Sequence, residues 1–205
     1  MPSYAELRCK TAFSLLRGAS HPQELVGRAG ELGLSALAVT DLETLAGAAR
    51  AHLAAKEVGL PLVVGAEVAP RDGPALVLLA QDRAGYGRLC RLITTGRRRA
   101  AKGTCDLLLA DVLSHAEGLI AIGTEKGSGV FSARVAPPRG GVVASAEKAP
   151  DPFSVLRAAF GDRLYLALEA HRGSDEVAHL RALDRAAAAL GIPTVATNDV
   201  HYHDR

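Results

Sequence analysis

The sequence predicts an α/β domain built mainly from parallel βα units, and three observations support this fold class. Short apolar runs of strand length alternate along the chain with longer stretches of helical period. Strands separated by helices pair in parallel, with helices covering both faces of the sheet. The chain has 205 residues, of which 48% are hydrophobic, so it is long enough to bury the core of one domain. Periodicity alone leaves an open sheet and a closed barrel as alternatives.

The first part of the chain contains four apolar runs and three helical stretches. Strands are expected at residues 4–11, 36–40, 60–68 and 76–80, and helices at 22–32, 44–58 and 83–99. Ser20 or His21 stands near the start of the first helix, and Pro22 suits its first turn. Gly59 ends the second helix, because glycine tolerates the left-handed backbone that closes helices.

The second part of the chain continues this alternation. Strands are expected at residues 119–122, 164–169 and 193–198, and helices at 107–116, 152–160 and 175–190. Residues 123–150 break the pattern, because they are rich in Gly, Ser, Pro and Ala and show little helical period. This composition is typical of a mobile surface insertion, and a functional lid is the alternative. We therefore expect a single domain over residues 1–205 with an insertion at 123–150.

Composition excludes several classes of function. Cys9, Cys90 and Cys105 are far apart and odd in number, which indicates reduced thiols rather than disulfides or a zinc knuckle. No apolar run approaches the roughly 20 residues of a membrane span, and the first ten residues lack the apolar centre of a signal peptide. A cytoplasmic location without a membrane partner is therefore expected. GxGxxG and GxxxxGK[ST] motifs are absent, which argues against a dinucleotide or P-loop site.

Side chains that suit metal ions follow four of the predicted strands. They are Asp41, Glu67, His171, Asp199, His201 and His203. Ligands of α/β proteins bind at the carboxyl ends of the strands, so these groups are expected to meet at one rim. Carboxylates and imidazoles are ligands of Zn²⁺, Mn²⁺ and Mg²⁺. Asp199 and His201 stand two residues apart, so on an extended strand both side chains would face one polar site.

These residues also have structural interpretations. Asp41 is as well placed to cap the helix expected at 44–58, and His171 is as well explained as a surface loop histidine. Glu67 is harder to explain in this way, because an unpaired carboxylate at the end of an apolar strand is costly to bury. The histidines on or beside predicted helices are expected to be solvated or structural, namely His21, His52, His115 and His179.

A basic cluster follows the helix expected at 83–99. Arg97, Arg98, Arg99 and Lys102 form it, in a chain whose formal net charge is only +2. Such a cluster is suited to contact a DNA backbone or an acidic partner. The alternative is a solvated helix end, whose cations offset the negative end of the helix dipole.

Several segments, taken in order, resemble a known family, the PHP domain (polymerase and histidinol phosphatase domain) at the N-terminus of bacterial C-family DNA polymerases. These segments are YAELRCKTAFSLLRGASHPQELV, LGLSALAVTDLETLAGAARAH, GLPLVVGAEV, LVLLAQDRAGYGRLCRLIT and GIPTVATNDVHYHD. RCKTAFSLLRGASHP, GRRRAAKG and FGDRLYLALEAH are most similar to the error-prone branch of this family, which acts in damage tolerance. The resemblance covers nearly the whole chain except residues 123–150, and it implies a distorted (βα)7 barrel.

The resemblance implies a metal centre that has lost about half of its ligands. A His-x-His pair begins the first strand of active PHP domains, and Arg8 and Lys10 stand at the similar positions here. Arg17 stands where a further ligand is usual, and Leu42 stands after Asp41 where the histidine of a Thr-Asp-His motif is usual. The retained positions are Glu67, His171, Asp199 and His201.

These replacements predict a change in what the centre holds. Arg and Lys are not metal ligands at neutral pH, and two cations beside Glu67 and Asp199 would replace the charge of a metal with ion pairs. They would also repel a divalent ion by about 1–4 kcal/mol at effective dielectrics of about 20 to 80. We therefore expect no complete trinuclear centre, and either no cofactor or one weakly bound Zn²⁺, Mn²⁺ or Mg²⁺.

The leading hypothesis from this resemblance is a structural and regulatory domain. It would brace the polymerase module of an error-prone, DNA-synthesising parent protein, contact DNA or other replication or mutasome subunits, and lack proofreading activity. No polymerase module is recognisable in these 205 residues, so the domain alone is not expected to synthesise DNA. The rival hypothesis is a stand-alone metal-dependent phosphoesterase, in which a metal-activated water attacks and Arg8 and Lys10 clamp the phosphate.

Overall fold

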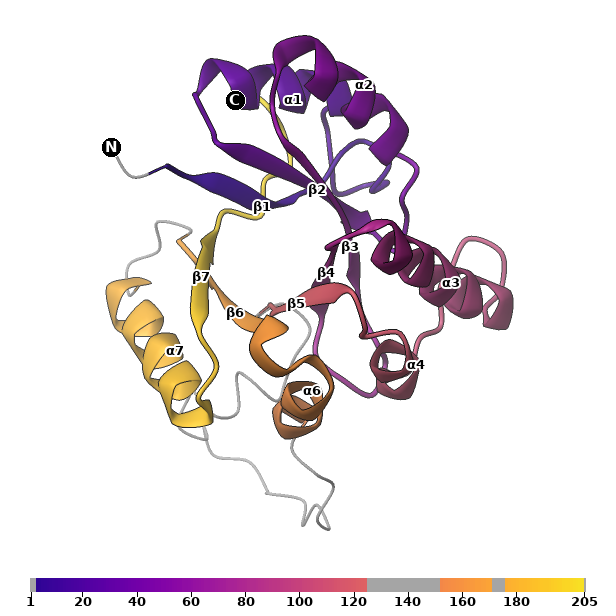
Figure 1. The fold of residues 1–205 in the computed structure, drawn as a ribbon, viewed down its shortest axis with the longest axis vertical. Helices are drawn as coiled ribbons and strands as arrows, with labels where there is room; N and C mark the ends of the chain where they lie inside the picture. Colours follow the sequence, from indigo (N-terminus) through magenta and orange to yellow (C-terminus); the bar gives the residue numbers. More distant parts are fainter. Residues whose placement is uncertain (1–2, 125–151, 171–175, 205) are drawn as a thin grey trace.

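The computed structural model describes residues 3–124, 152–170 and 176–204. Over these ranges seven strands form one sheet in the order β1-β2-β3-β4-β5-β6-β7 (Figure 1). The strands are β1 (Ala5–Cys9), β2 (Ala36–Leu42), β3 (Leu62–Val68), β4 (Leu76–Ala80), β5 (Leu119–Gly123), β6 (Leu164–Glu169) and β7 (Thr194–Thr197). Every strand expected from the apolar runs is therefore present. The insertion expected at 123–150 lies outside the described residues, except Gly123, which belongs to β5, and Thr124.

Helices surround the ring of strands on its outer side (Figure 1). They are α1 (Pro22–Glu31), α2 (Ala48–Val58), α3 (Arg83–Arg99), α4 (Leu109–Ser114), α6 (Pro152–Phe160) and α7 (Glu176–Leu190). α2 begins at Ala48 rather than at residue 44, because Glu43 adopts a left-handed backbone with φ of 51° and turns the chain before the helix. None of the described helices has the length and hydropathy needed to cross a membrane.

The sheet closes nearly into a barrel, because β1 meets the segment that follows β7. Cys9 and Val200 form an isolated parallel bridge. The N–H of Lys10 donates to the carbonyl of Val200 at 2.8 Å, and the N–H of Val200 donates to the carbonyl of Arg8 at 2.9 Å. The distorted seven-stranded barrel is therefore confirmed, and the open sheet is excluded.

β4 departs from the parallel pairing expected from the sequence, because it runs antiparallel to both β3 and β5. Residues 69–75 connect β3 to β4. This connection is too short for a parallel crossover, which needs about a dozen residues. Between β4 and β5 the helices α3 and α4 return the chain to the end from which it left, so β5 is parallel to β3. The other adjacent pairs are parallel.

The alternation of side chains along each strand separates an outer core from the barrel interior. Leu76 and Leu78 pack outward beneath the helices, whereas Val77 and Leu79 face the interior. The interior is apolar at the end of the barrel where the parallel strands begin. It contains a cavity of about 360 Å³ there, which is lined by residues such as Tyr165. Charged side chains occupy the opposite end, where the parallel strands finish. This end is the rim at which the sequence predicts a site.

Candidate functional site at the barrel mouth

Arg8 lies buried at the mouth of the barrel, and its guanidinium contacts carboxylates from three other parts of the fold. Its Nε and Nη2 atoms donate to Glu67 Oε2 at 3.0 and 2.8 Å, and its Nη1 donates to Glu169 Oε1 at 2.5 Å. Nε also lies 3.2 Å from Asp199 Oδ1. Burial alone would lower the pKa of Arg8, but attraction to Glu67, Glu169 and Asp199 raises it above its ordinary value. Arg8 therefore remains a cation.

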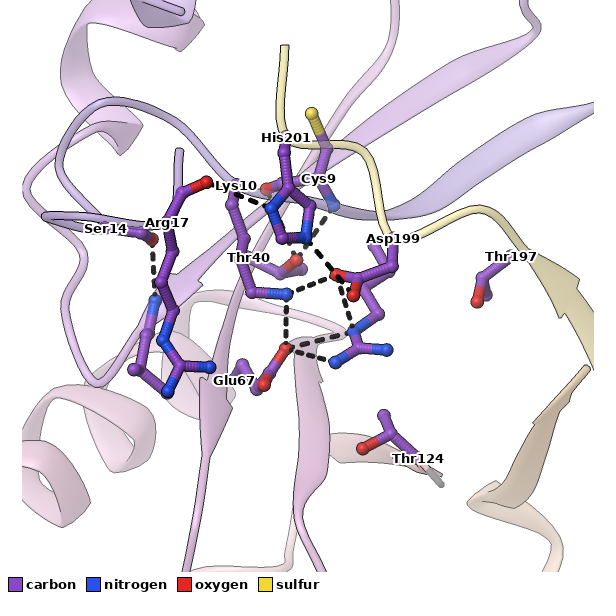
Figure 2. Close-up of polar contacts among 12 residues, drawn as sticks. Cys9, Lys10, Ser14, Arg17, Thr40, Glu67, Thr124, Thr197, Asp199 and His201 are labelled. Carbon is purple, nitrogen blue, oxygen red and sulfur yellow. Dashed lines mark hydrogen bonds and ion pairs between the residues drawn. The ribbon is translucent and has the colours of Figure 1, made fainter. Parts of the chain in front are cut away.

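Lys10 supplies a second buried cation to the same carboxylates. Its Nζ lies 2.7 Å from Glu67 Oε2 and donates to Asp199 Oδ1 (Figure 2). The side chains of Arg8 and Lys10 are each 1% exposed. Two cations thus face the three carboxylates of Glu67, Glu169 and Asp199. Removing one partner from such a network leaves a buried charge without compensation.

A β-bulge in β1 accounts for the inward direction of Arg8. Glu6 pairs with Leu37 and Cys9 pairs with Val39, so β1 holds one residue more than β2 over this stretch. Cys9 packs outside the barrel with residues of α1 and α2, and burial raises the pKa of its thiol. Bulges redirect side chains next to functional sites, and here the extra residue directs Arg8 toward the interior.

The carboxylate of Glu6 fills the gap that the bulge leaves between β1 and the end of β7. Its Oε1 accepts the backbone N–H of Arg8 at 2.9 Å and that of Asn198 at 3.3 Å. Its Oε2 accepts from the Tyr4 hydroxyl at 2.9 Å and from Asn198 Nδ2 at 3.0 Å. Buried backbone N–H groups need partners, so Glu6 replaces the missing ladder bonds at this seam.

Asp41 fixes the loop between β1 and α1 and is not a helix cap. Its buried carboxylate accepts from the N–H and Oγ1 of Thr11 at 2.7 and 2.8 Å, and from Ser14 Oγ at 2.6 Å. Ser14 Oγ in turn accepts the N–H of Leu42 at 3.0 Å (Figure 2). The capping alternative is therefore wrong, because α2 begins later than expected and is preceded by Gly47, which offers no side chain.

Asp199 and His201 lie together, although not on an extended strand. β7 ends at Thr197, and Asp199 has a left-handed backbone with φ of 49°. This turn, rather than strand alternation, places His201 Nε2 3.2 Å from Asp199 Oδ2 (Figure 2). His201 Nδ1 lies 3.0 Å from the carbonyl oxygen of Arg17. Both ring nitrogens face oxygen acceptors, so only the doubly protonated ring donates both hydrogen bonds.

The other predicted site residues are more scattered. Arg17 is exposed and meets the site through its backbone carbonyl, while Leu42 is half-buried at the rim. His171 lies outside the described residues. His203 is turned toward α1, where its Nδ1 lies 2.8 Å from Ser20 Oγ.

The donor set at the mouth does not fit a complete metal centre. The two carboxylates expected as residual ligands, Glu67 and Asp199, already face Arg8 and Lys10 at ion-pair distances. Within the described ranges, His, Cys, Asp and Glu side chains form no group of three or more arranged to hold an ion. We therefore derive no chemical step through a metal.

The basic cluster at the C-terminal end of α3 does not form one free surface. Arg97 donates to the carbonyls of Thr104 and Glu43, at 3.3 and 3.0 Å. Arg99 forms a two-point ion pair with Asp111, at 2.6 and 3.0 Å. Arg98 and Lys102 are exposed. Two of the four cations thus hold the chain that follows the helix.

Sequence reasoning missed two residues of the mouth, Glu169 and Glu6. Glu169 ends β6 on the same inward alternation as Tyr165 and Ala167. Its place at the carboxyl end of a strand was the same signal that singled out Glu67. The role of Glu6 depends on the bulge, which leaves no mark in the apolar pattern.

Comparison with known sequences identifies the family. The PHP domain family matches residues 6–171 of the chain. An error-prone DNA polymerase from Rhodopirellula baltica is 44% identical over 202 residues, which are 98% of this chain and 17% of that protein. An error-prone DNA polymerase from Pseudomonas paraeruginosa is 45% identical over 206 residues, which are 100% of this chain and 18% of that protein. The chain therefore spans less than a fifth of the length of these relatives.

Solved structures share the fold at low sequence identity. A candidate metal-dependent phosphoesterase from Bifidobacterium adolescentis superposes with a TM-score of 0.63 at 18% identity, over 98% of this chain and 88% of that one. The lesion-specific endonuclease Q of Pyrococcus furiosus superposes with a TM-score of 0.60 at 12% identity, over 98% and 48% of the two chains. At such identities the likeness supports the barrel fold alone.

Proposed function

This chain belongs to the PHP domain family, and from that premise we propose that it is the N-terminal PHP domain of an error-prone DNA polymerase in which ion pairs have replaced the metal centre. In this proposal the domain is structural. It holds the mouth of its barrel in a fixed shape beside the polymerase module and performs no phosphoester hydrolysis of its own.

The observation that carries the proposal is the placement of Arg8 and Lys10. Both are cations, both are buried, and both face Glu67, the carboxylate that the family resemblance assigns to a metal. A guanidinium or ammonium group has no exchangeable ligand position, so it cannot bind and activate a water molecule as a metal ion does. The carboxylates are nevertheless paired with cations, so none of these three is buried without a counter-charge.

The role and partners in the parent protein follow from the relatives. Error-prone DNA polymerases of five to six times this length contain the matching segment, so the polymerase module is the proposed partner within the same chain. The proposal also includes contacts with DNA and with other subunits of a replication or mutasome assembly. It further includes a cytoplasmic location. A PHP domain without phosphoesterase activity would suit a polymerase that does not proofread through this domain.

Metal content and hydrolysis test the proposal together. The purified chain is dialysed against Mn²⁺ or Zn²⁺, its metal is measured by elemental analysis, and release of phosphate from p-nitrophenyl phosphate and of nucleotides from a DNA 3′ end is followed. We expect at most one ion per chain and no turnover above the buffer.

A matched double variant, Arg8→His with Lys10→His, restores the imidazole pair of active PHP domains. This variant should hold more metal per chain than the parent, because two cations are replaced by ligands. Two or more stoichiometric ions with measurable turnover in the parent chain would overturn the proposal and favour the rival phosphoesterase.

A further inference from the structure

A groove on α3 lies apart from the barrel mouth. It forms a hollow of about 460 Å³ that is lined by Cys90, Arg91, Thr94, Thr95, Arg98 and His115. The first five belong to α3, and His115 directly follows α4. Arg91, Thr94 and Arg98 are three and four residues apart in turn, so they project from one face of the helix.

Arg91 and Arg98 are the two cations that line this groove. Both are exposed, and the guanidinium of neither forms a hydrogen bond or ion pair within the described part of the chain. Other cations of the helix are paired, because Arg88 lies 2.6 Å from Glu117 and Arg99 pairs with Asp111. The groove pair shares only Arg98 with the Arg97–Lys102 cluster that stands out in the sequence.

The surroundings of the groove favour an anion. No carboxylate lines it, and Asp111 and Glu117, which flank His115 in the sequence, are already ion-paired. The hydrogen bond from Arg99 lowers the pKa of Asp111, so that pair persists at neutral pH. The hydroxyls of Thr94 and Thr95 donate to helix carbonyls at 2.8 and 3.0 Å, so the two guanidiniums remain as donors for a ligand.

We infer that this groove binds the phosphate backbone of duplex DNA through Arg91 and Arg98. Guanidinium forks match phosphate oxygens, and a spacing of seven helical residues separates the two forks by about 10.5 Å along the axis, so each neutralises its own phosphate. An acidic protein partner is less suited, because the lining holds no Phe, Tyr, Trp or large aliphatic side chain to anchor a protein interface. The inference rests on the proposed function, in which the parent protein handles DNA.

Salt dependence of DNA binding tests the inference. A fluorescent duplex of mixed sequence is titrated with the 205-residue chain at several salt concentrations, and the logarithm of affinity is plotted against the logarithm of salt. Each neutralised phosphate contributes about 0.9 to the slope, so the Arg91→Ala/Arg98→Ala variant should lose about 1.8. The matched control is Arg181→Ala/Arg185→Ala, which removes the same charge from exposed positions of α7.

The possible results of the salt titration distinguish a DNA site on α3 from the alternatives. A slope that falls by about 1.8 in the α3 variant and stays unchanged in the α7 variant supports the site. Equal losses in both variants would show an effect of net charge only, and an unchanged slope in the α3 variant would show no contact there. Binding of a polyglutamate peptide as tight as that of DNA would indicate an acidic protein partner. Each of these three results overturns the inference, while the metal and hydrolysis test of the barrel mouth stands independently of them.

Discussion

Replacing Arg8 with methionine should destabilise the domain by a large fraction of its total stability. Methionine fills a similar volume but removes the guanidinium that pairs with Glu67, Glu169 and Asp199, while Lys10 stays beside Glu67 and Asp199. Two unit charges 4 Å apart attract by about 4 kcal/mol at an effective dielectric of 20, and breaking one buried ion pair typically costs about 3–5 kcal/mol. Domains are stable by only about 5–15 kcal/mol, so a loss of about 3–5 kcal/mol is about a fifth of the total or more.

Urea denaturation followed by circular dichroism measures this loss. With an m-value of about 2 kcal/mol/M, a loss of about 4 kcal/mol lowers the midpoint by about 2 M. Arg181→Met, on the exposed face of α7, is the matched control and should stay within about 0.5 kcal/mol of the parent. If Arg8→Met does not fold, Arg8→Lys keeps the charge without the fork and reports the same loss in part.

A double variant isolates the electrostatic part of the effect. Adding Glu169→Gln to Arg8→Met removes the charge of a carboxylate that the Arg8 guanidinium contacts in the parent, so the second change should cost less than it does alone. Residues in direct contact show such coupling energies of about 0.5–3 kcal/mol. A cost of Arg8→Met below about 1 kcal/mol, or a coupling of zero, would refute the view that ion pairs hold the barrel mouth.

Three further predictions concern the seam, helix packing and a thiol. Glu6→Ala should cost about 2–3 kcal/mol and speed hydrogen exchange at the end of β7, whereas protection as in the parent would count against the seam role. Gly85→Ala should destabilise α3, because a Cβ there would lie 2.1 Å from a backbone carbonyl oxygen. Gly87→Ala should raise the melting temperature slightly, because its Cβ would make only an ordinary contact with the end of the Arg91 side chain at 3.8 Å. Burial and the nearby Glu43 raise the pKa of Cys105 to about 11, so its thiol is protonated at neutral pH. The rate of its alkylation by iodoacetamide should therefore rise with pH until about pH 11. A rate that stops rising near about pH 9 would contradict this prediction.

Much of the barrel was predictable because its elements carry strong local signals. Residues 83–99, 152–160 and 164–169 match the observed elements, since local pattern decides them. At the first of these, the Asp82 carboxylate accepts the N–H of Gly85 at 2.7 Å and marks the helix start. The antiparallel direction of β4 was not predictable from apolar runs, because it depends on the length and return path of the connections.

The candidate site was predictable where strand ends carry charge, and not where the backbone is irregular. Glu67 projects into the mouth because it ends a regular strand. The inward turn of Arg8 depends on a bulge, and the meeting of Asp199 with His201 depends on a left-handed turn. Neither feature can be recognised from composition or periodicity, so the sequence indicated Arg8, Asp199 and His201 but not how their side chains meet.

The proposed replacement of a metal centre by ion pairs accounts for a barrel mouth that keeps its shape without an ion. A divalent ion in a barrel mouth joins strand ends by binding carboxylates from several of them at once. Arg8 does the same from β1, because its fork reaches Glu67 at the end of β3 and Glu169 at the end of β6. Lys10 extends the connection to Asp199 after β7. Ion pairs of this kind keep the connections between strands but provide no open position for water or phosphate. In the proposed function, the site therefore stabilises the barrel without catalysing hydrolysis.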